Sequence, residues 1–207
     1  MSPYHIPLCP NETYHLFNRA VGSEKLFYTA DNYRYFLDKM KQHILPIADF
    51  FTYSLIPNHF HLLVRIKDGK IIAQHFEQKK KKIFNATSSC LSDFIMEQFS
   101  NWLNGYTKAF NKMYNRKGAL FMDYIKRSIV SEDSDFTSYI FYIHKNATHH
   151  NLCDKIGIWA HDGYQSLLSD KPTLLLRDET IAWFGSRERF IEFHDQPVPS
   201  KKVELFE

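Results

Sequence analysis

The stretch PNHFHLLVRI, residues 57–66, carries two histidines, His59 and His61, and is otherwise mostly apolar from residue 60 onward. The run FFTYSLI, residues 50–56, lies directly before it, and only Pro57 and Asn58 separate the two histidines from this run. Aromatic and β-branched runs of this length, joined by a turn-forming pair, predict two antiparallel strands in a close connection. We therefore expect an antiparallel sheet in which one strand begins with the histidines.

The segments before this pair of strands predict a further strand and a helix. Residues 13–19, TYHLFNR, alternate apolar with polar side chains and run into a turn at residues 20–23, which is typical of a strand. Asp31 can cap a helix that ends before Pro46, because proline cannot continue the helical hydrogen-bond ladder. The apolar side of this helix is expected to carry Tyr35, Phe36, Met40 and Ile44.

The segments after the pair predict two helices and a strand. Residues 67–89 are polar and show little periodicity, so we expect a mobile loop or a weak helix there. Residues 92–114 repeat apolar side chains at three- and four-residue steps and predict a long helix. A strand over residues 120–130 follows, and then a helix that Ser134 or Asp135 can cap.

The composition is that of an ordinary globular chain. At 207 residues, the chain is long enough for one well-buried core with elaborations. A formal net charge of +3 permits nucleic-acid binding without indicating it. Cys9, Cys90 and Cys153 show no paired spacing, which argues against a disulfide framework or a cysteine zinc site. With no run near the ~18 apolar residues of a membrane span and no signal peptide, we expect a soluble protein of the reducing cytoplasm.

His59 and His61 occupy alternate positions of the predicted strand. Side chains two residues apart project from one face of a strand, so the imidazoles lie side by side while Phe60 and Leu62 face the opposite layer. Two neutral imidazoles suit Mn²⁺, Fe²⁺, Ni²⁺ or Zn²⁺ better than Ca²⁺, and Mg²⁺ fits where oxygen atoms complete the shell. An isolated H-x-H also arises by chance in a chain with 11 histidines, so the pair alone supports only a hypothesis of metal binding.

Tyr142 and Asn146 lie four residues apart on the last of these predicted helices. This spacing places both side chains on one helix face, from which a further metal ligand can come. On its own, a bulky residue such as Tyr142 is more typical of a place in the core than of a catalytic role. Tyr139, one turn earlier, and the more remote Tyr124 are competing tyrosines, and the position of Asn146 favours Tyr142.

Five blocks of the sequence together resemble REP-associated tyrosine transposases and their insertion-sequence relatives. The blocks are YHLFNRAV, PNHFHLLV, LNGYTKAFNKMYNRKGALF, YIKRSIV and FYIHKNA, and they cover roughly residues 13–152 in the order and spacing of that family. The resemblance implies that His59 and His61 hold a divalent ion, Mg²⁺ or Mn²⁺. It also implies that Tyr142 is the nucleophile and that Asn146 completes the metal site.

The same resemblance implies a fold, a domain organisation and a reaction. The fold is α+β, a ferredoxin-like antiparallel sheet of about four or five strands with packed helices. Residues 1–152 would form a single-tyrosine HUH nuclease domain, and residues 153–207 a C-terminal helical extension and tail. The reaction cuts and rejoins single-stranded, hairpin-containing DNA through a 5′-phosphotyrosine intermediate. Members often continue the tyrosine block with Asn-Pro-Val, whereas Ala147 and Thr148 follow Asn146 here, so the helix end is expected to differ.

Four cationic side chains are candidates for DNA contact. They are Arg19, Arg65, Lys126 and Arg127. Cations interleaved with aromatic residues can follow a phosphate backbone while bases stack, but the same residues suit a solvated surface. The four lysines at 79–82 have the same two interpretations. His144, His149 and His150 are expected at the surface or near DNA rather than as further metal ligands.

Other classes of function are weighed beside the transposase. A cupin-like oxygenase or an amidohydrolase also uses H-x-H, but a cupin needs a glycine-rich all-β chain, and this chain has seven glycines and long predicted helices. Amidohydrolase barrels usually exceed ~200 residues. A domesticated DNA-binding protein would keep the fold without transposition. The sequence also leaves open whether the chain acts as a monomer or as a homodimer.

Overall fold

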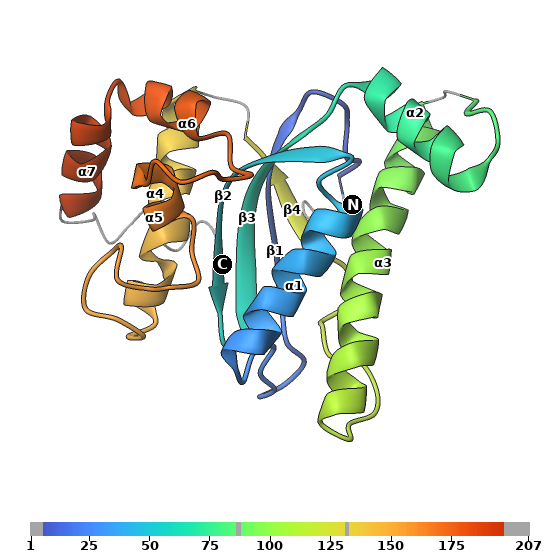
Figure 1. Cartoon of the computed structure of the whole chain (residues 1–207), viewed down its shortest axis with the longest axis horizontal. Helices are drawn as coiled ribbons and strands as arrows, with labels where there is room; N and C mark the ends of the chain where they lie inside the picture. The colour runs from blue at the N-terminus through green and yellow to red at the C-terminus, as the bar shows by residue number, and fades with distance from the viewer. Residues whose placement is uncertain (1–5, 86–87, 131–132, 197–207) are drawn as a thin grey trace.

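The computed structural model describes residues 6–85, 88–130 and 133–196. In this part of the chain four antiparallel strands form one sheet, in the order β2-β3-β1-β4, and seven helices accompany it (Figure 1). The strands are β1 (Thr13–Arg19), β2 (Ala48–Ile56), β3 (His59–Ile66) and β4 (Lys126–Ile129). The helices are α1 (Ala30–His43), α2 (Gly69–Lys80), α3 (Ser88–Met113), α4 (Asp133–His149), α5 (Tyr164–Leu168), α6 (Arg177–Phe184) and α7 (Arg187–Asp195). The strand order and connections are those of a ferredoxin-like sheet, so the expected α+β class is confirmed.

β2 and β3 form the hairpin that the sequence predicts, with residues 57–58 as its loop. β1 pairs with the other side of β3, so that Arg19 lies opposite His59 and Phe17 lies opposite His61. β3 is therefore an inner strand of the sheet, and the histidines at its start lie level with the end of β1.

β4 is shorter than the strand predicted over residues 120–130. Tyr124 has a φ of 58°, which interrupts extended backbone and is uncommon for a residue with a side chain. Before it, Phe121 makes an isolated antiparallel bridge to the residue that follows β1. The side-chain amide of Asn18 donates to the Met122 carbonyl at 3.2 Å. The first half of the predicted strand is therefore a loop held beside β1, and the strand prediction is wrong there.

The start of α1 also differs from its prediction. Its N-cap is Thr29, and the side-chain oxygen of Asn32 accepts from the backbone N–H of Thr29 at 3.3 Å and from the preceding N–H at 2.9 Å. Asp31, the predicted cap, lies in the first turn and pairs with Arg34. Tyr35, predicted on the apolar side, is 38% exposed, whereas the other three residues predicted there are buried. The helix thus starts slightly earlier and turns a somewhat different face to the core.

Residues 67–89, predicted as a mobile loop or a weak helix, contain the regular helix α2. Asp68 caps this helix, because its side chain accepts a hydrogen bond from the N–H of Lys70 at 2.8 Å. Lys79 and Lys80 hydrogen-bond polar side chains of α3. Of the two predicted alternatives the helix is correct, and two of the four lysines in this region are held against α3.

The sheet separates two hydrophobic cores. One face packs against α1 and α3, where Trp102 Nε1 donates to the Phe36 carbonyl at 3.1 Å. Leu63, two residues after His61 and so on the same face of β3, belongs to the other core, which α4 and the later helices build. Figure 1 shows these helical layers on the two sides of the sheet. α4 therefore covers the face that carries the histidines.

Residues 153–196 complete this second core. The segment follows the outer edge of β2, where the N–H of Leu55 donates to the His161 carbonyl at 2.9 Å. At Gly163 a Cβ would lie 2.3 Å from the hydroxyl oxygen of Thr52, so the close packing of this residue on the Thr52 side chain requires glycine. The predicted helical extension is therefore a layer packed on the sheet and on α4, while a domain boundary after residue 152 stays a prediction.

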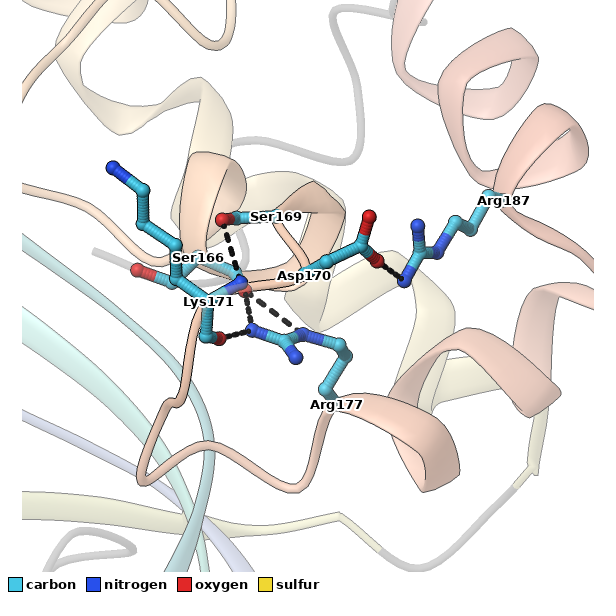
Figure 2. Close-up of polar contacts among 6 residues, drawn as sticks. All are labelled: Ser166, Ser169, Asp170, Lys171, Arg177 and Arg187. Carbon is cyan, nitrogen blue, oxygen red and sulfur yellow. Dashed lines mark hydrogen bonds and ion pairs between the residues drawn. The ribbon is translucent and has the colours of Figure 1, made fainter.

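Polar contacts join the three short helices of this extension (Figure 2). Arg177 donates two hydrogen bonds to the Ser166 carbonyl, at 2.9 and 3.1 Å, and so ties α6 to α5. Arg187, the first residue of α7, pairs with Asp170 at 2.7 Å. These contacts tie α6 to α5, and α7 to the loop that follows α5.

Within the described residues, no helix is long and apolar enough to span a membrane. The predicted cap residues Ser134 and Asp135 have side chains outside the described part of the chain. The predicted tail over residues 197–207 also lies outside the described residues.

Candidate active site

His59 and His61 lie side by side on one face of β3. Their ring centroids are 5.1 Å apart and their planes are nearly perpendicular, at 86°. His61 is 3% exposed, while His59, at the start of the strand, is half-buried. Arg19 and Phe17 project from the same face, because directly paired residues of antiparallel strands point to one side. Strand alternation thus gathers two imidazoles, a cation and an aromatic ring.

α4 crosses this face and brings Asn146 and Tyr142 to the histidines. The side-chain amide of Asn146 lies against His59 Nε2, with Oδ1 at 3.2 Å and Nδ2 at 3.1 Å. The ring of Tyr142 meets the ring of His61 edge-on, at a centroid distance of 5.3 Å and an angle of 90°. Because Tyr142 and Asn146 are one helical turn apart, one face of α4 contacts both histidines. The structure thus brings the four predicted site residues together.

Hydrogen bonding and burial set the protonation of the histidine pair. His59 Nδ1 lies 3.0 Å from the side-chain oxygen of Asn58, which accepts, so the ring proton is on Nδ1 and Nε2 keeps a lone pair. Burial and, to a smaller extent, the neighbouring His150 lower the pKa of His59 to about 4. Burial also lowers the pKa of His61 well below its ordinary value. Both imidazoles are therefore neutral at neutral pH, the state that binds metal ions.

A third histidine, His15 of β1, lies beside the pair and was not among the predicted site residues. Its Nε2 is 2.8 Å from His61 Nδ1, and the two rings are nearly parallel, at 6°, with centroids 5.0 Å apart. Burial lowers the pKa of His15 to about 3. The strand register pairs His15 with Leu63 and thereby sets it beside His61. Strand pairing, rather than any local motif, is the signal that would have found it.

The two competing tyrosines occupy other positions. Tyr139 packs on His15 with a centroid distance of 5.2 Å, and its hydroxyl lies 3.3 Å from Ser128 Oγ on β4. Tyr124 is 69% exposed in the loop before β4. Tyr142 lies against His61 itself, which makes it the best placed of the three to act beside the histidine pair.

The side chains gathered here can supply two imidazole nitrogens and one amide oxygen to a cation. Among the residues that the structure describes, no three His, Cys, Asp or Glu side chains form a metal-binding group. The third ligand would be the amide of Asn146, whose oxygen lies 3.2 Å from His59 Nε2. Two ligands at right angles on an ion with bonds of about 2.1 Å lie about 3.0 Å apart. The donor chemistry and this spacing fit a divalent cation such as Mn²⁺ or Mg²⁺.

Two of the four predicted DNA-contacting cations lie near the histidines. Arg19 is exposed and directly opposite His59 in the sheet register. Lys126 Nζ lies 5.5 Å from the centre of the Phe17 ring, on the same face. His150, just after α4, packs edge-on against His59 at 4.8 Å. These three groups therefore surround the histidine pair on one face of the sheet.

The other two cations are engaged in internal contacts. Arg127, the second residue of β4, projects to the opposite face of the sheet, where it is 8% exposed and donates to the Ile6 carbonyl. Arg65 lies at the far end of β3 from His59 and makes a bidentate ion pair with Glu179, at 2.6 and 3.0 Å. Neither side chain therefore lies beside the histidines, because strand alternation places Arg127 on the opposite face of the sheet and Arg65 lies at the other end of β3, and a DNA contact by either one stays a prediction.

A chain of hydrogen bonds links the sheet through α4 to α7. Thr52 Oγ1 lies 2.6 Å from His144 Nε2, and His144 Nδ1 lies 2.9 Å from His194 Nε2. His194 Nδ1 in turn lies 2.7 Å from the Phe190 carbonyl. Because a carbonyl only accepts, His194 holds its proton on Nδ1, His144 donates from Nδ1 and the threonine hydroxyl donates to His144. The prediction that His144 lies at the surface is wrong, since it is buried in this chain of contacts.

Burial lowers the pKa of both histidines in this chain, and that of His194 falls to about 4. Both are thus neutral at neutral pH, as the directions of the hydrogen bonds require. These contacts hold α4 in one rotation about its axis. The face that carries Tyr142 and Asn146 is thereby kept toward β3.

Comparison with known proteins gives one informative likeness. No family model matches the sequence, and no curated protein matches it. Among solved structures the chain is similar to a REP-associated tyrosine transposase bound to a REP hairpin, with a TM-score of 0.54. The match covers 83% of this chain and 89% of that chain at 13% sequence identity. At that identity the likeness concerns the fold: the chain folds as a REP-associated tyrosine transposase does.

Proposed function

We propose that this protein is a metal-dependent endonuclease and strand transferase that acts on single-stranded DNA. The observation that carries the proposal is the convergence of four side chains on one sheet face, namely His59, His61, Asn146 and Tyr142. They come from β3 and α4, which are far apart in the sequence. Covalent cleavage of a phosphodiester needs a nucleophile and a positive charge beside the phosphate. A tyrosine packed against neutral imidazoles that can bind a cation supplies both.

His59, His61 and Asn146 are the residues that would hold the divalent ion, Mn²⁺ or Mg²⁺. When bound, the ion supplies positive charge beside the scissile phosphate, where negative charge builds on the non-bridging oxygens. Asn58 keeps the ring proton of His59 on Nδ1 and so leaves Nε2 free to ligate. Asn146 lies one turn after Tyr142 on α4 and therefore couples the position of the cation site to that of the nucleophile.

Tyr142 carries out the covalent step. Its phenolic oxygen forms a bond to phosphorus as the bond from phosphorus to the 3′-oxygen breaks; the phenol loses its proton and the departing 3′-oxygen gains one. The product is a 5′-phosphotyrosine link that keeps the phosphodiester energy, so a 3′-hydroxyl can reverse the step and join strands without ATP. Packing against His61 holds the tyrosine ring beside the histidine pair, and catalysis by a nucleophile depends on such positioning.

The proposed partner is single-stranded DNA that folds into a hairpin. The protein whose fold this chain shares was solved with a REP hairpin. Arg19 and Lys126 stand on the histidine face and supply positive charge for phosphates. A phosphate that crosses this face would be drawn to the cations and presented to the histidine pair.

A labelled-DNA cleavage assay tests the proposal. The purified chain is incubated with hairpin-containing single-stranded DNA labelled at its 3′ end, because the 3′ fragment keeps the phosphotyrosine link. With Mn²⁺ or Mg²⁺, the wild-type chain should give a labelled adduct that resists SDS. Tyr142→Phe and His61→Ala should each lose it. Tyr139→Phe, which removes a hydroxyl one turn away, is the matched control and should retain it.

Two outcomes would count against the proposal in different ways. An adduct that persists in Tyr142→Phe and disappears in Tyr139→Phe would contradict the choice of nucleophile. Tight hairpin binding without cleavage under any divalent ion would favour a DNA-binding protein that keeps the fold without the chemistry.

A further inference from the structure

His15 has no part in the reaction proposed above, yet it lies at the centre of the site. Its Nε2 is 2.8 Å from His61 Nδ1, and both side chains are buried. Neighbouring strands hold the two rings parallel within 6°. A hydrogen bond between two neutral imidazoles has one donor and one acceptor, so this contact decides which nitrogen of His61 carries its proton.

Two arrangements satisfy the bond, and only one suits a metal ligand. If His15 donates, His61 Nδ1 accepts with its lone pair and the proton of His61 is on Nε2, so neither nitrogen of His61 is available to a metal ion. If His61 donates from Nδ1, its Nε2 lone pair is free on the side away from His15. His59 already has the second arrangement, since its Nδ1 donates to Asn58 and leaves Nε2 free.

We propose that His15 is a positioning residue that accepts the Nδ1 proton of His61 and holds His61 with Nε2 free for the divalent ion. The identity of the ligand rests on the proposed function, whereas the contact between the two histidines does not. Metal-ligating histidines commonly donate their second ring N–H to a carboxylate or carbonyl, and loss of that partner typically weakens metal binding 10–100-fold. His15 stands in the place of that partner.

Three variants separate the hydrogen bond from simple packing. His15→Leu removes the acceptor and keeps an apolar side chain in the buried position. His15→Gln keeps an acceptor oxygen at the end of the side chain. Phe17→Leu is the packing control, because Phe17 stacks on His15 at 5.0 Å and on His61 at 5.5 Å without a hydrogen bond to either.

The first measurement is the Mn²⁺ affinity of the DNA-free chain by titration calorimetry. His15→Leu should bind Mn²⁺ about 10–100-fold more weakly than the wild type, and His15→Gln within about threefold of it. Phe17→Leu should stay closer to the wild type than His15→Leu does. A folded His15→Leu chain with wild-type affinity would overturn the proposal.

The second measurement is the imidazole ¹⁵N spectrum of His61 in the metal-free chain, which reports its tautomer. The wild type and His15→Gln should show His61 protonated on Nδ1, and His15→Leu should lose that preference. If the wild type neither binds Mn²⁺ nor forms the DNA adduct, the proposed function fails. A wild-type His61 that is protonated on Nε2 would refute the role of His15, whatever the result for metal binding. Should His15→Leu not fold, His15→Asn replaces it, because its shorter amide does not reach His61.

Discussion

At the scale of single residues, Asp162 shows how burial couples this fold to pH. Its Oδ1 accepts from the N–H of Tyr164 at 3.0 Å, and its buried Oδ2 has no hydrogen-bond partner among the described residues. Burial raises the pKa of Asp162 from 3.8 to about 7. The folded state therefore binds the proton more tightly than the unfolded chain does. The free energy of unfolding therefore falls as pH rises from about 4 to about 7, and the loss stays constant above that range.

Asp162→Asn should remove this pH-dependent cost. The amide oxygen can still accept from Tyr164, while the charge that burial penalises is gone. We expect the variant to gain up to about 4 kcal/mol of unfolding free energy at pH 8 and nothing at pH 4, from about three pKa units at 1.36 kcal/mol each. Urea unfolding at the two pH values measures the difference.

Asp170→Asn is the matched control for this experiment. Asp170 is exposed and pairs with Arg187, which lowers the pKa of its carboxyl, so its loss should bring no gain at pH 8. An Asp162→Asn chain with the same stability change at pH 4 and pH 8 would show that ionisation of Asp162 is not the cause.

Individual residues were predictable where their place depends on local periodicity. His59 and His61 share a strand face, and Tyr142 and Asn146 share a helix face, because the spacings two and four are properties of those elements. His15 was not predictable in this way, since its neighbour is set by the register of β1 against β3. Arg127 lies away from the histidines for a related reason: a shift of one residue along a strand moves a side chain to the other face.

At the scale of elements, α4 is the piece that the site depends on most. Its Tyr142 and Asn146 meet the histidines only in one rotation about the helix axis. The chain from Thr52 through His144 to His194 holds that rotation from two sides, the sheet and α7. α7 thus acts on the site through its contact with α4.

His194→Leu should destabilise the protein and loosen α4. The change leaves the buried Nδ1–H of His144 without its acceptor, which costs about 1–3 kcal/mol, and the lost contact with the Phe190 carbonyl adds to this. We expect a loss of about 2–4 kcal/mol in unfolding free energy, measured by urea denaturation.

Ile191→Ala, on the same helix, supplies the control. Ile191 is 40% exposed, so its truncation should change the unfolding free energy by no more than about 1 kcal/mol. Equal losses in the two variants would mean that α7 contributes general packing rather than a specific hold on α4.

Prediction of the elements succeeded where patterns are long and failed where tertiary contacts decide. The β2–β3 hairpin and α3 follow from apolar runs and repeats that extend over many residues. α2 has a weaker pattern, and its packing on α3 stabilises it. The loop before β4 contradicts its strand-like composition because Tyr124 takes a positive φ that no local propensity favours.

At the scale of the whole molecule, the extension and α4 form one continuous core on the histidine face. This core includes side chains from the sheet, from α4 and from the last three helices; among them are Phe51, Leu63, Ile140, Leu167 and Phe190. The sequence predicted a helical extension but not this packing, because contacts between distant segments leave no periodic signal. The four candidate site residues lie together inside a single chain.

A mixing experiment tests whether one chain is sufficient. His61→Ala retains Tyr142, and Tyr142→Phe retains the histidines, so a site shared between two chains would be restored in a mixture. Because His61 and Tyr142 of one chain are already in contact, we expect the mixture to remain inactive in the adduct assay. Recovery of a substantial fraction of wild-type adduct would show that α4 reaches the site of a second copy.

The most direct test of the central claim is to locate the covalent link itself. The adduct formed on hairpin DNA with Mn²⁺ is digested with nuclease and protease, and the peptide that carries the nucleotide is sequenced by mass spectrometry. We predict a nucleotide 5′-phosphate on Tyr142. A phosphate on Tyr139, Tyr124 or any other residue, with Tyr142 unmodified, would contradict the claim that the histidine face and α4 form the cleavage site.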